Sequence, residues 1–364
     1  MIVLQLDILK KIISNKPMLE KWLTKKQIWI LRGLGGLILV GQFGVFIWFG
    51  YRNEHPSKLS QPPSQYYDLE IVQTLAGESA QHLTLSADGR TLVGAGGGNG
   101  KTITVWQLPN PQPQFTLQGH TNDIYDIALS VDAHTLVSGS LDNTIKVWNL
   151  TTRKLNFTLT GHSAVVNAIV MPPDGKTIVS ASADRTIKVW NLATGKFIRT
   201  FATTSDVVVS LALSPDGQTL VSGDFGNNIT IWNLTTGQKR MNLTGHYSWV
   251  KALAISRDGK LLASGSPKQA KVWILATGAL VRDFGGFYRP QISLAFSPDG
   301  KSVIAGGGGE GYRVWNLATG NIEAIVTQKS NWSGAVLFSP DGKSMISSTD
   351  EGIAVWKFAP QRAL

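Results

Sequence analysis

The chain has 364 residues, of which 43% are hydrophobic, and it contains no cysteine. This length allows a large folded core, whereas the absence of cysteine excludes disulfide bonds, thiol catalysis and cysteine zinc sites. The formal net charge is +10, and more than half of it comes from residues 1–58, where nine Lys or Arg oppose three acidic residues. Residues 59–364 lack the clustered basic and aromatic residues that nucleic-acid binding needs, so we expect no nucleic-acid partner.

The first part of the chain has the composition of a membrane anchor. Residues 1–27 are a basic N-terminal flank with six lysines, either solvated or forming a surface helix drawn to anionic lipid. Residues 33–50 then carry no charge, and as a helix they would rise about 27 Å, close to the hydrocarbon thickness of a bilayer. Aromatic residues stand at both ends of this run. We predict a single transmembrane helix over residues 28–51.

Two other interpretations of this segment are a buried helix and a cleaved signal peptide. No amphipathic partner helix occurs elsewhere, and the residues after the apolar run lack a small-residue cleavage site. Five Lys or Arg closely precede the run and two closely follow it, which favours a cytoplasmic N-terminus. We therefore expect a single-pass membrane protein with its folded domain on the non-cytoplasmic side, after a polar spacer at residues 52–67.

Residues 68–364 repeat a unit that is clearest in SADRTIKVWNLATGK, residues 182–196. Its β-branched run between Asp- and Gly-containing turns indicates a strand. Its tryptophan recurs every 41 or 42 residues, at Trp106, Trp148, Trp190, Trp232, Trp273, Trp315 and Trp356. Hairpin turns recur out of phase with it, at Asp88, Asp132, Asp174, Asp216, Asp258, Asp299 and Asp341. A period of about 40 to 45 residues is typical of propellers with four-stranded blades. We predict an all-β, seven-bladed β-propeller.

At these residues the chain resembles the WD40-repeat family, in the form of bacterial-type tandem repeats behind an N-terminal membrane anchor. Three repeats carry the family's Gly-His pair, at residues 119–120, 161–162 and 245–246. The resemblance implies two hydrogen-bonded tetrads: His120, Ser138, Asp142 and Trp148, and His162, Ser180, Asp184 and Trp190. Ser140 or Ser182 could replace the chosen serine. Other blades lack the His or the Asp, as at Pro267 and Gly309, and should be held more by packing than by such a network.

The sequences at the two ends of the repeat array predict how the ring closes. Residues 68–77, DLEIVQTLAG, look like the outer strand of a blade, and the sequence after Trp356 contains no such strand. We expect this early strand to complete the last blade, which would remove an open edge.

No catalytic, cofactor-binding or metal-binding constellation emerges. The glycine-rich run AGGGNGKT, residues 95–102, approaches a phosphate-binding loop but precedes a strand instead of the helix that such a loop needs. His55, His82 and His134 have no spacing that suggests convergence with carboxylates. We expect neither an enzyme nor a small-molecule substrate.

The resemblance implies a scaffold that binds other proteins through loops on one face of the ring. Candidate contact residues there are Trp249, Trp332, Tyr125, Arg289 and Phe225, for each of which core packing is the alternative. The main hypothesis is thus a membrane-tethered, non-enzymatic interaction scaffold. The alternative is a propeller enzyme or small-ligand binder that uses the central channel, which titratable side chains with perturbed pKa values at the channel mouth would indicate.

Overall fold

The computed structural model describes residues 29–33, 36–40, 69–77, 79–202, 206–267, 269–285, 293–306, 311–326, 333–349 and 352–358. The chain divides into two units, Met1–Ser64 and Gln65–Leu364.

In the first unit, β1 (Trp29–Gly33) and β2 (Gly36–Val40) pair as antiparallel strands. This differs from the transmembrane helix predicted over residues 28–51. Gly33 pairs with Gly36 at the end of the ladder, and glycine within a helix costs about 1 kcal/mol relative to alanine. Within the described residues, no helix has the length and apolar character needed to cross a membrane. The rest of the predicted span, the basic flank and the spacer lie outside the described residues.

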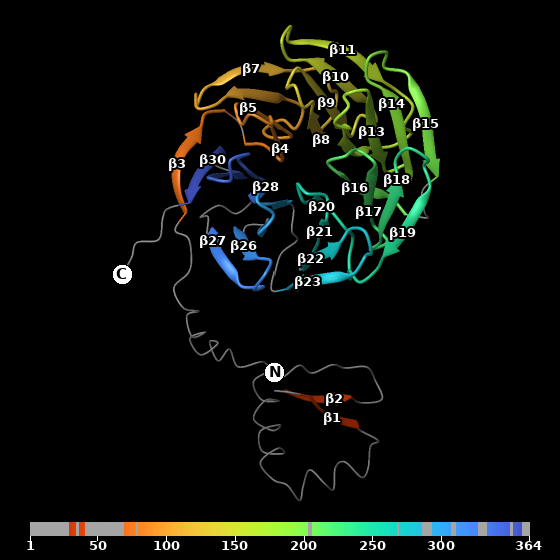
Figure 1. Cartoon of the computed structure of the whole chain (residues 1–364), viewed down its shortest axis with the longest axis vertical. Coiled ribbons are helices and arrows are strands. Elements are labelled where there is room, and N and C mark those ends of the chain that lie inside the picture. The colour runs from red at the N-terminus through yellow and green to blue at the C-terminus, as the bar shows by residue number, and fades with distance from the viewer. Residues whose placement is uncertain are drawn as a thin grey trace, which may run out of the picture. The chain divides into compact units, whose positions relative to one another are not determined.

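The second unit is a ring of seven four-stranded antiparallel sheets, as predicted (Figure 1). In blades one to six the strands follow the chain from the centre outward. Blade one contains β4 (His82–Leu85), β5 (Thr91–Ala95), β6 (Ile103–Gln107) and β7 (Pro113–Leu117). Blade two contains β8 (Ile124–Leu129), β9 (Thr135–Ser140), β10 (Ile145–Asn149) and β11 (Lys154–Leu159). Blade three contains β12 (Val166–Val170), β13 (Thr177–Ser182), β14 (Thr186–Asn191) and β15 (Phe197–Ala202).

The next three blades repeat this order. Blade four contains β16 (Val208–Leu213), β17 (Thr219–Asp224), β18 (Ile229–Asn233) and β19 (Lys239–Leu243). Blade five contains β20 (Ala252–Ile255), β21 (Leu261–Ser266), β22 (Gln269–Ile274) and β23 (Leu280–Phe284). Blade six contains β24 (Ser293–Phe296), β25 (Ser302–Gly306), β26 (Tyr312–Asn316) and β27 (Ile322–Val326).

Blade seven joins the two ends of the ring. It contains β28 (Ser333–Phe338), β29 (Ser344–Thr349), β30 (Gly352–Phe358) and, as its outer strand, β3 (Leu69–Leu75). The β3–β30 pairing is antiparallel and runs from Leu69 opposite Phe358 to Leu75 opposite Ile353. The predicted closure of the ring by residues 68–75 is therefore confirmed. The pairing covers the edge of β30 that would otherwise stand open.

The hydrophobic core lies between neighbouring blades. Each of the seven blade interfaces contains a cluster of buried apolar side chains. The periodic tryptophan of each blade belongs to the cluster shared with the blade before it, as Trp190 packs with Val147 and Leu159 of blade two. The repeated tryptophan thus supplies a large apolar surface at every interface, which explains why it recurs once per blade.

Candidate functional site

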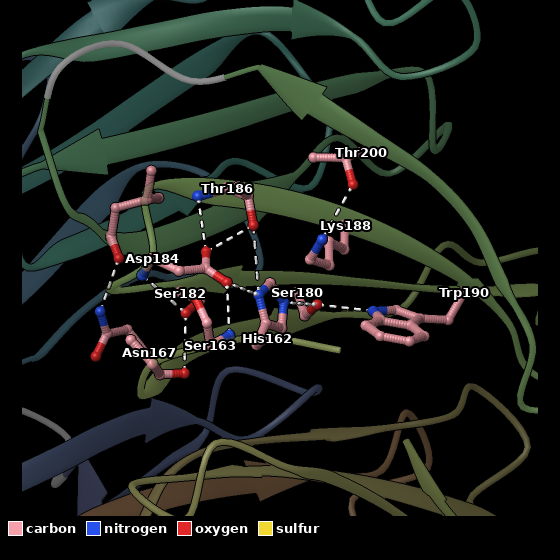
Figure 2. A network of polar contacts seen from close by, with 12 residues as sticks. His162, Ser163, Asn167, Ser180, Ser182, Asp184, Thr186, Lys188, Trp190 and Thr200 are labelled. Carbon is pink, nitrogen blue, oxygen red and sulfur yellow. Dashed lines mark hydrogen bonds and ion pairs between the residues drawn. The ribbon is translucent and has the colours of Figure 1, made fainter. Parts of the chain in front are cut away.

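A chain of hydrogen bonds crosses blade three from its outer part to its β13–β14 hairpin (Figure 2). Trp190 Nε1 donates to Ser180 Oγ at 2.8 Å, and Ser180 Oγ lies 2.8 Å from His162 Nε2. His162 Nδ1 lies 2.8 Å from Asp184 Oδ2. Because a carboxylate only accepts, Nδ1 carries the proton and Nε2 accepts from the serine. All four polar groups are satisfied within the blade.

Blade two repeats this arrangement. His120 joins Asp142 and Ser138, each at 2.8 Å, and Trp148 donates to Ser138 at 2.9 Å. Burial lowers the pKa of His120, although Asp142 partly opposes the shift. Burial raises the pKa of Asp142, but hydrogen bonds from Thr144 and His120 outweigh it and bring that pKa to about 2. The carboxylate therefore stays ionised and holds the hairpin turn.

The glycine before the histidine of each tetrad has a steric role. Gly161 has a φ of 142°, and a Cβ there would lie 3.2 Å from the ring of Trp190. A Cβ on Gly119 would lie 2.9 Å from the ring of Trp148. Only a residue without a side chain lets the backbone pass this close to the tryptophan, so the Gly-His pair is a packing feature.

The alternative serines, Ser140 and Ser182, make hydrogen bonds that differ from those of the tetrad serines. Ser182 Oγ donates to the Ala164 carbonyl and accepts from the Asp184 backbone N–H, each at 3.0 Å. Ser140 makes the equivalent bonds with Asn122 and Asp142 in blade two. These serines therefore fix the hairpin carrying the Asp and do not contact the Trp indole.

The blades without a complete tetrad keep more of the network than the sequence suggests. Tryptophan indoles still donate to a buried serine at 2.8 or 2.9 Å, in the pairs Trp232–Ser222, Trp273–Ser264 and Trp356–Ser347. These blades therefore keep part of the polar network where the His or the Asp is missing. The indole–serine bond survives because it needs no histidine or aspartate.

The innermost strands enclose a cavity of about 530 Å³ at one end of the central channel. Its walls are residues of these first strands, residues just before them, and two loops between second and third strands, at Gly96 and Phe225. We call this cavity the channel mouth; its lining includes His82, Asp126, Asn167, Ser210, Lys251 and Ser293, one from each of blades one to six. Its volume is within the range of small-molecule sites.

Aromatic side chains from neighbouring blades meet at the channel mouth. Phe225 of blade four stacks on Trp249, which precedes β20 of blade five, with ring centres 5.1 Å apart and planes 12° apart. Phe225 is 50% exposed and Tyr125, on β8, is 42% exposed. Three of the five candidate contact residues therefore line this cavity. Trp332 and Arg289 lie outside the described residues.

Titratable side chains also converge at the channel mouth. His82 Nδ1 lies 4.0 Å from Asp126 Oδ1. Burial, with a smaller contribution from the charge of Lys251, lowers the pKa of His82 to about 3. Burial raises the pKa of Asp126 to about 7, against two backbone N–H bonds that favour the carboxylate. Burial also lowers the pKa of Lys251.

Sequence reasoning missed this group of titratable residues. The three side chains come from different blades, and only closure of the ring brings them together. A local signal did exist for Asp126, a charged residue in an otherwise apolar first strand. No group of three or more His, Asp or Glu side chains suited to a metal ion occurs among the described residues. After the glycine-rich run at residues 95–102 comes strand β6, so the context of a phosphate-binding loop is missing.

The fold defines the class of this protein: a seven-bladed β-propeller, in which the blade tryptophan donates to a buried serine in blades two to five and seven. A family model described as "WD domain, G-beta repeat" matches residues 111–149, 153–191, 195–233 and 237–273. Residues 111–273 therefore contain four WD40 repeats, and these repeats form part of the seven-bladed ring. No curated protein matches the chain at a significant level. WD40 propellers generally bind other proteins and are generally not catalytic.

Proposed function

We propose that this protein is a membrane-tethered, non-enzymatic interaction scaffold whose channel mouth holds a segment of a partner protein. The observation that carries the proposal is the stack of the exposed Phe225 on the partly buried Trp249 in the lining of the cavity. Rigid aromatic side chains beside a cavity are the usual anchors of protein interfaces, because they bury large areas at low entropic cost. Their position on adjacent blades of a closed ring keeps them preorganised.

Photo-crosslinking tests the interaction role. A photoreactive amino acid is placed at Phe225 in cells, and crosslinked products are identified by mass spectrometry. We expect one defined protein partner to be captured at this position. The matched control is Val131, which is 64% exposed in the β8–β9 turn, away from the lining of the mouth. Equal capture of the same proteins at both positions, or no capture at Phe225, would contradict the proposal.

The proposed membrane tether is supported by the uncharged run at residues 33–50 and by the basic residues before it. Its charge bias favours a propeller on the non-cytoplasmic side. Protease added to intact cells or spheroplasts should then digest the propeller or the 52–67 spacer and spare residues 1–27. A propeller protected until the membrane is lysed would reverse the orientation. Full-length protein in the soluble fraction without detergent would rule out the anchor.

A second candidate function is the binding of a small ligand in the channel. It is favoured by the convergence of His82, Asp126 and Lys251, whose pKa values all depart from their ordinary values. A small-molecule library screened by thermal shift tests this candidate. We expect any channel ligand to raise the melting temperature of the wild type but not that of Ser210→Trp, which fills the cavity. A hit that stabilises both proteins equally binds elsewhere.

A further inference from the structure

Lys251 places an ammonium group at the channel mouth. Its Nζ lies 5.4 Å from the centre of the Trp249 ring, a cation–π contact. The ion pairs found in the described part of the chain do not include Lys251. Burial lowers the pKa of Lys251, so a negative charge brought next to it would stabilise the ammonium form.

Other polar groups that the structure describes in this cavity are engaged in bonds of their own. Asp126 uses both oxygens to accept backbone N–H bonds, from Ile127 at 2.9 Å and from Ile169 at 2.7 Å. Its pKa of about 7 leaves it partly protonated near neutrality. Asn167 and Ser210 donate to backbone carbonyl groups of the next blade, at 2.9 and 2.7 Å. These side chains are committed to bonds between blades.

The lining also contains a histidine and a second aspartate, neither of which forms an ion pair with Lys251. His82 has a pKa of about 3 and is neutral at physiological pH. Asp123 is exposed at the rim, where water screens its charge. Among the described residues that line the mouth, Lys251 is thus the one Lys or Arg, and it lies with a partly protonated Asp126, hydrogen-bonded polar groups and a half-exposed aromatic surface.

We propose that the channel mouth binds an acidic peptide segment of a partner protein, with a carboxylate of the segment paired to Lys251 and an apolar side chain lying on Phe225. This inference rests on the proposed interaction function and specifies the chemistry of the partner. A cavity of about 530 Å³ admits a few side chains and not a folded domain. The carboxylate gives a charge-assisted bond in a partly desolvated place, and the aromatic stack gives apolar area.

Peptide selection tests the proposal. A random peptide library displayed on phage is selected against the full-length protein in detergent micelles, and the Kd of each recovered peptide is measured by fluorescence anisotropy. We expect enriched peptides to carry Asp or Glu next to an apolar residue. Replacing that acidic residue with its amide should weaken binding about 10-fold or more, as should Lys251→Met. Lys251→Arg should retain most of the affinity.

The matched control is Lys260→Met, the same substitution in the same blade. Lys260 lies in the β20–β21 turn, and its side chain is 79% exposed. This variant should bind the peptides as the wild type does. The acid-to-amide change in the peptide needs no altered protein, so the test remains decisive if Lys251→Met fails to fold.

Three results would overturn the inference: enrichment of basic or uncharged peptides, acidic peptides bound equally by Lys251→Met, or no enriched peptide. Each is distinguishable from failure of the proposed function. Capture of a partner at Phe225 without dependence on acidic residues would leave the scaffold function standing and remove the assignment to Lys251. Absence of capture at Phe225 would remove the function itself.

Discussion

Ser266 occupies, in blade five, the place beside histidine that a carboxylate occupies in blades two and three. Its Oγ lies 2.8 Å from His246 Nδ1, while His246 Nε2 contacts Ser264 Oγ at 2.7 Å. A hydroxyl satisfies the ring nitrogen but carries no charge to stabilise an imidazolium. Burial, followed by the charge of Lys271, accordingly lowers the pKa of His246 to about 4. Blade five thus holds a histidine that must stay neutral.

This difference predicts that blade five is sensitive to acid. The pKa of His246 is lower in the folded state than its ordinary value of 6.5, so the unfolded chain binds more protons between these values. The stability contributed by the neutral histidine is complete above about pH 6.5 and is lost as the pH falls toward 4. Hydrogen exchange at pH 7 and 5 should show amides of β21 and β22 losing protection before those of β13 and β14. His246→Gln should abolish the difference, and equal loss in both blades would contradict the prediction.

The tetrads predict a site-specific loss of stability. Asp184→Ala should lower the free energy of unfolding by about 1 to 3 kcal/mol, because His162 and the backbone of the hairpin lose a buried acceptor. Asp174→Ala is the matched control in the same blade, since the carboxylate of Asp174 is exposed and accepts one backbone bond from Lys176. Urea titration measures both. Similar losses for the two variants would argue against a structural role for the network.

Closure of the ring by β3 predicts how far the N-terminus can be shortened before the propeller loses stability. Deletion of residues 1–64 removes none of the described propeller, and we expect a folded, soluble ring. Deletion of residues 1–76 removes β3 and also the Ala76 carbonyl, which accepts from Trp106 Nε1 at 2.9 Å. The longer deletion should unfold at a lower temperature or aggregate through the exposed edge of β30. Identical melting of both as monomers, measured by circular dichroism and light scattering, would refute the role of β3.

Blades six and seven are joined by a buried hydroxyl. Tyr312 is fully buried, and its hydroxyl lies 3.2 Å from the carbonyl oxygens of Gly334 and Ser348. Tyr312→Phe should cost about 1 kcal/mol or more, because these carbonyl groups lose their shared donor. Tyr125→Phe, at an exposed tyrosine, should be nearly neutral. The two variants are compared by denaturant titration, and equal effects would exclude a special role for the Tyr312 hydroxyl.

The periodic features of the sequence were sufficient to predict the ring. The spacing of tryptophans counts the blades, and the surplus strand at residues 68–75 identifies the closing partner of β30, because each blade needs four strands. The residues of the two tetrads could be named because the family resemblance assigns them by repeat position. Non-periodic features could not be predicted in this way. Asp126 enters the channel at a register shift in the β8–β9 ladder after Ile124, and its neighbours come from other blades.

The pairing of β3 with β30 sets the order in which the protein can be completed. Within the propeller β3 is synthesised first and β30 last. The β3–β30 pairing can therefore form only when nearly the whole domain has been synthesised. Blades one to six can form from consecutive hairpins as these are synthesised, whereas the ring closes only after β30 has been made. A translation product that ends before β30 therefore leaves β3 without its partner, and the unpaired strand edge is then open to pairing with other chains.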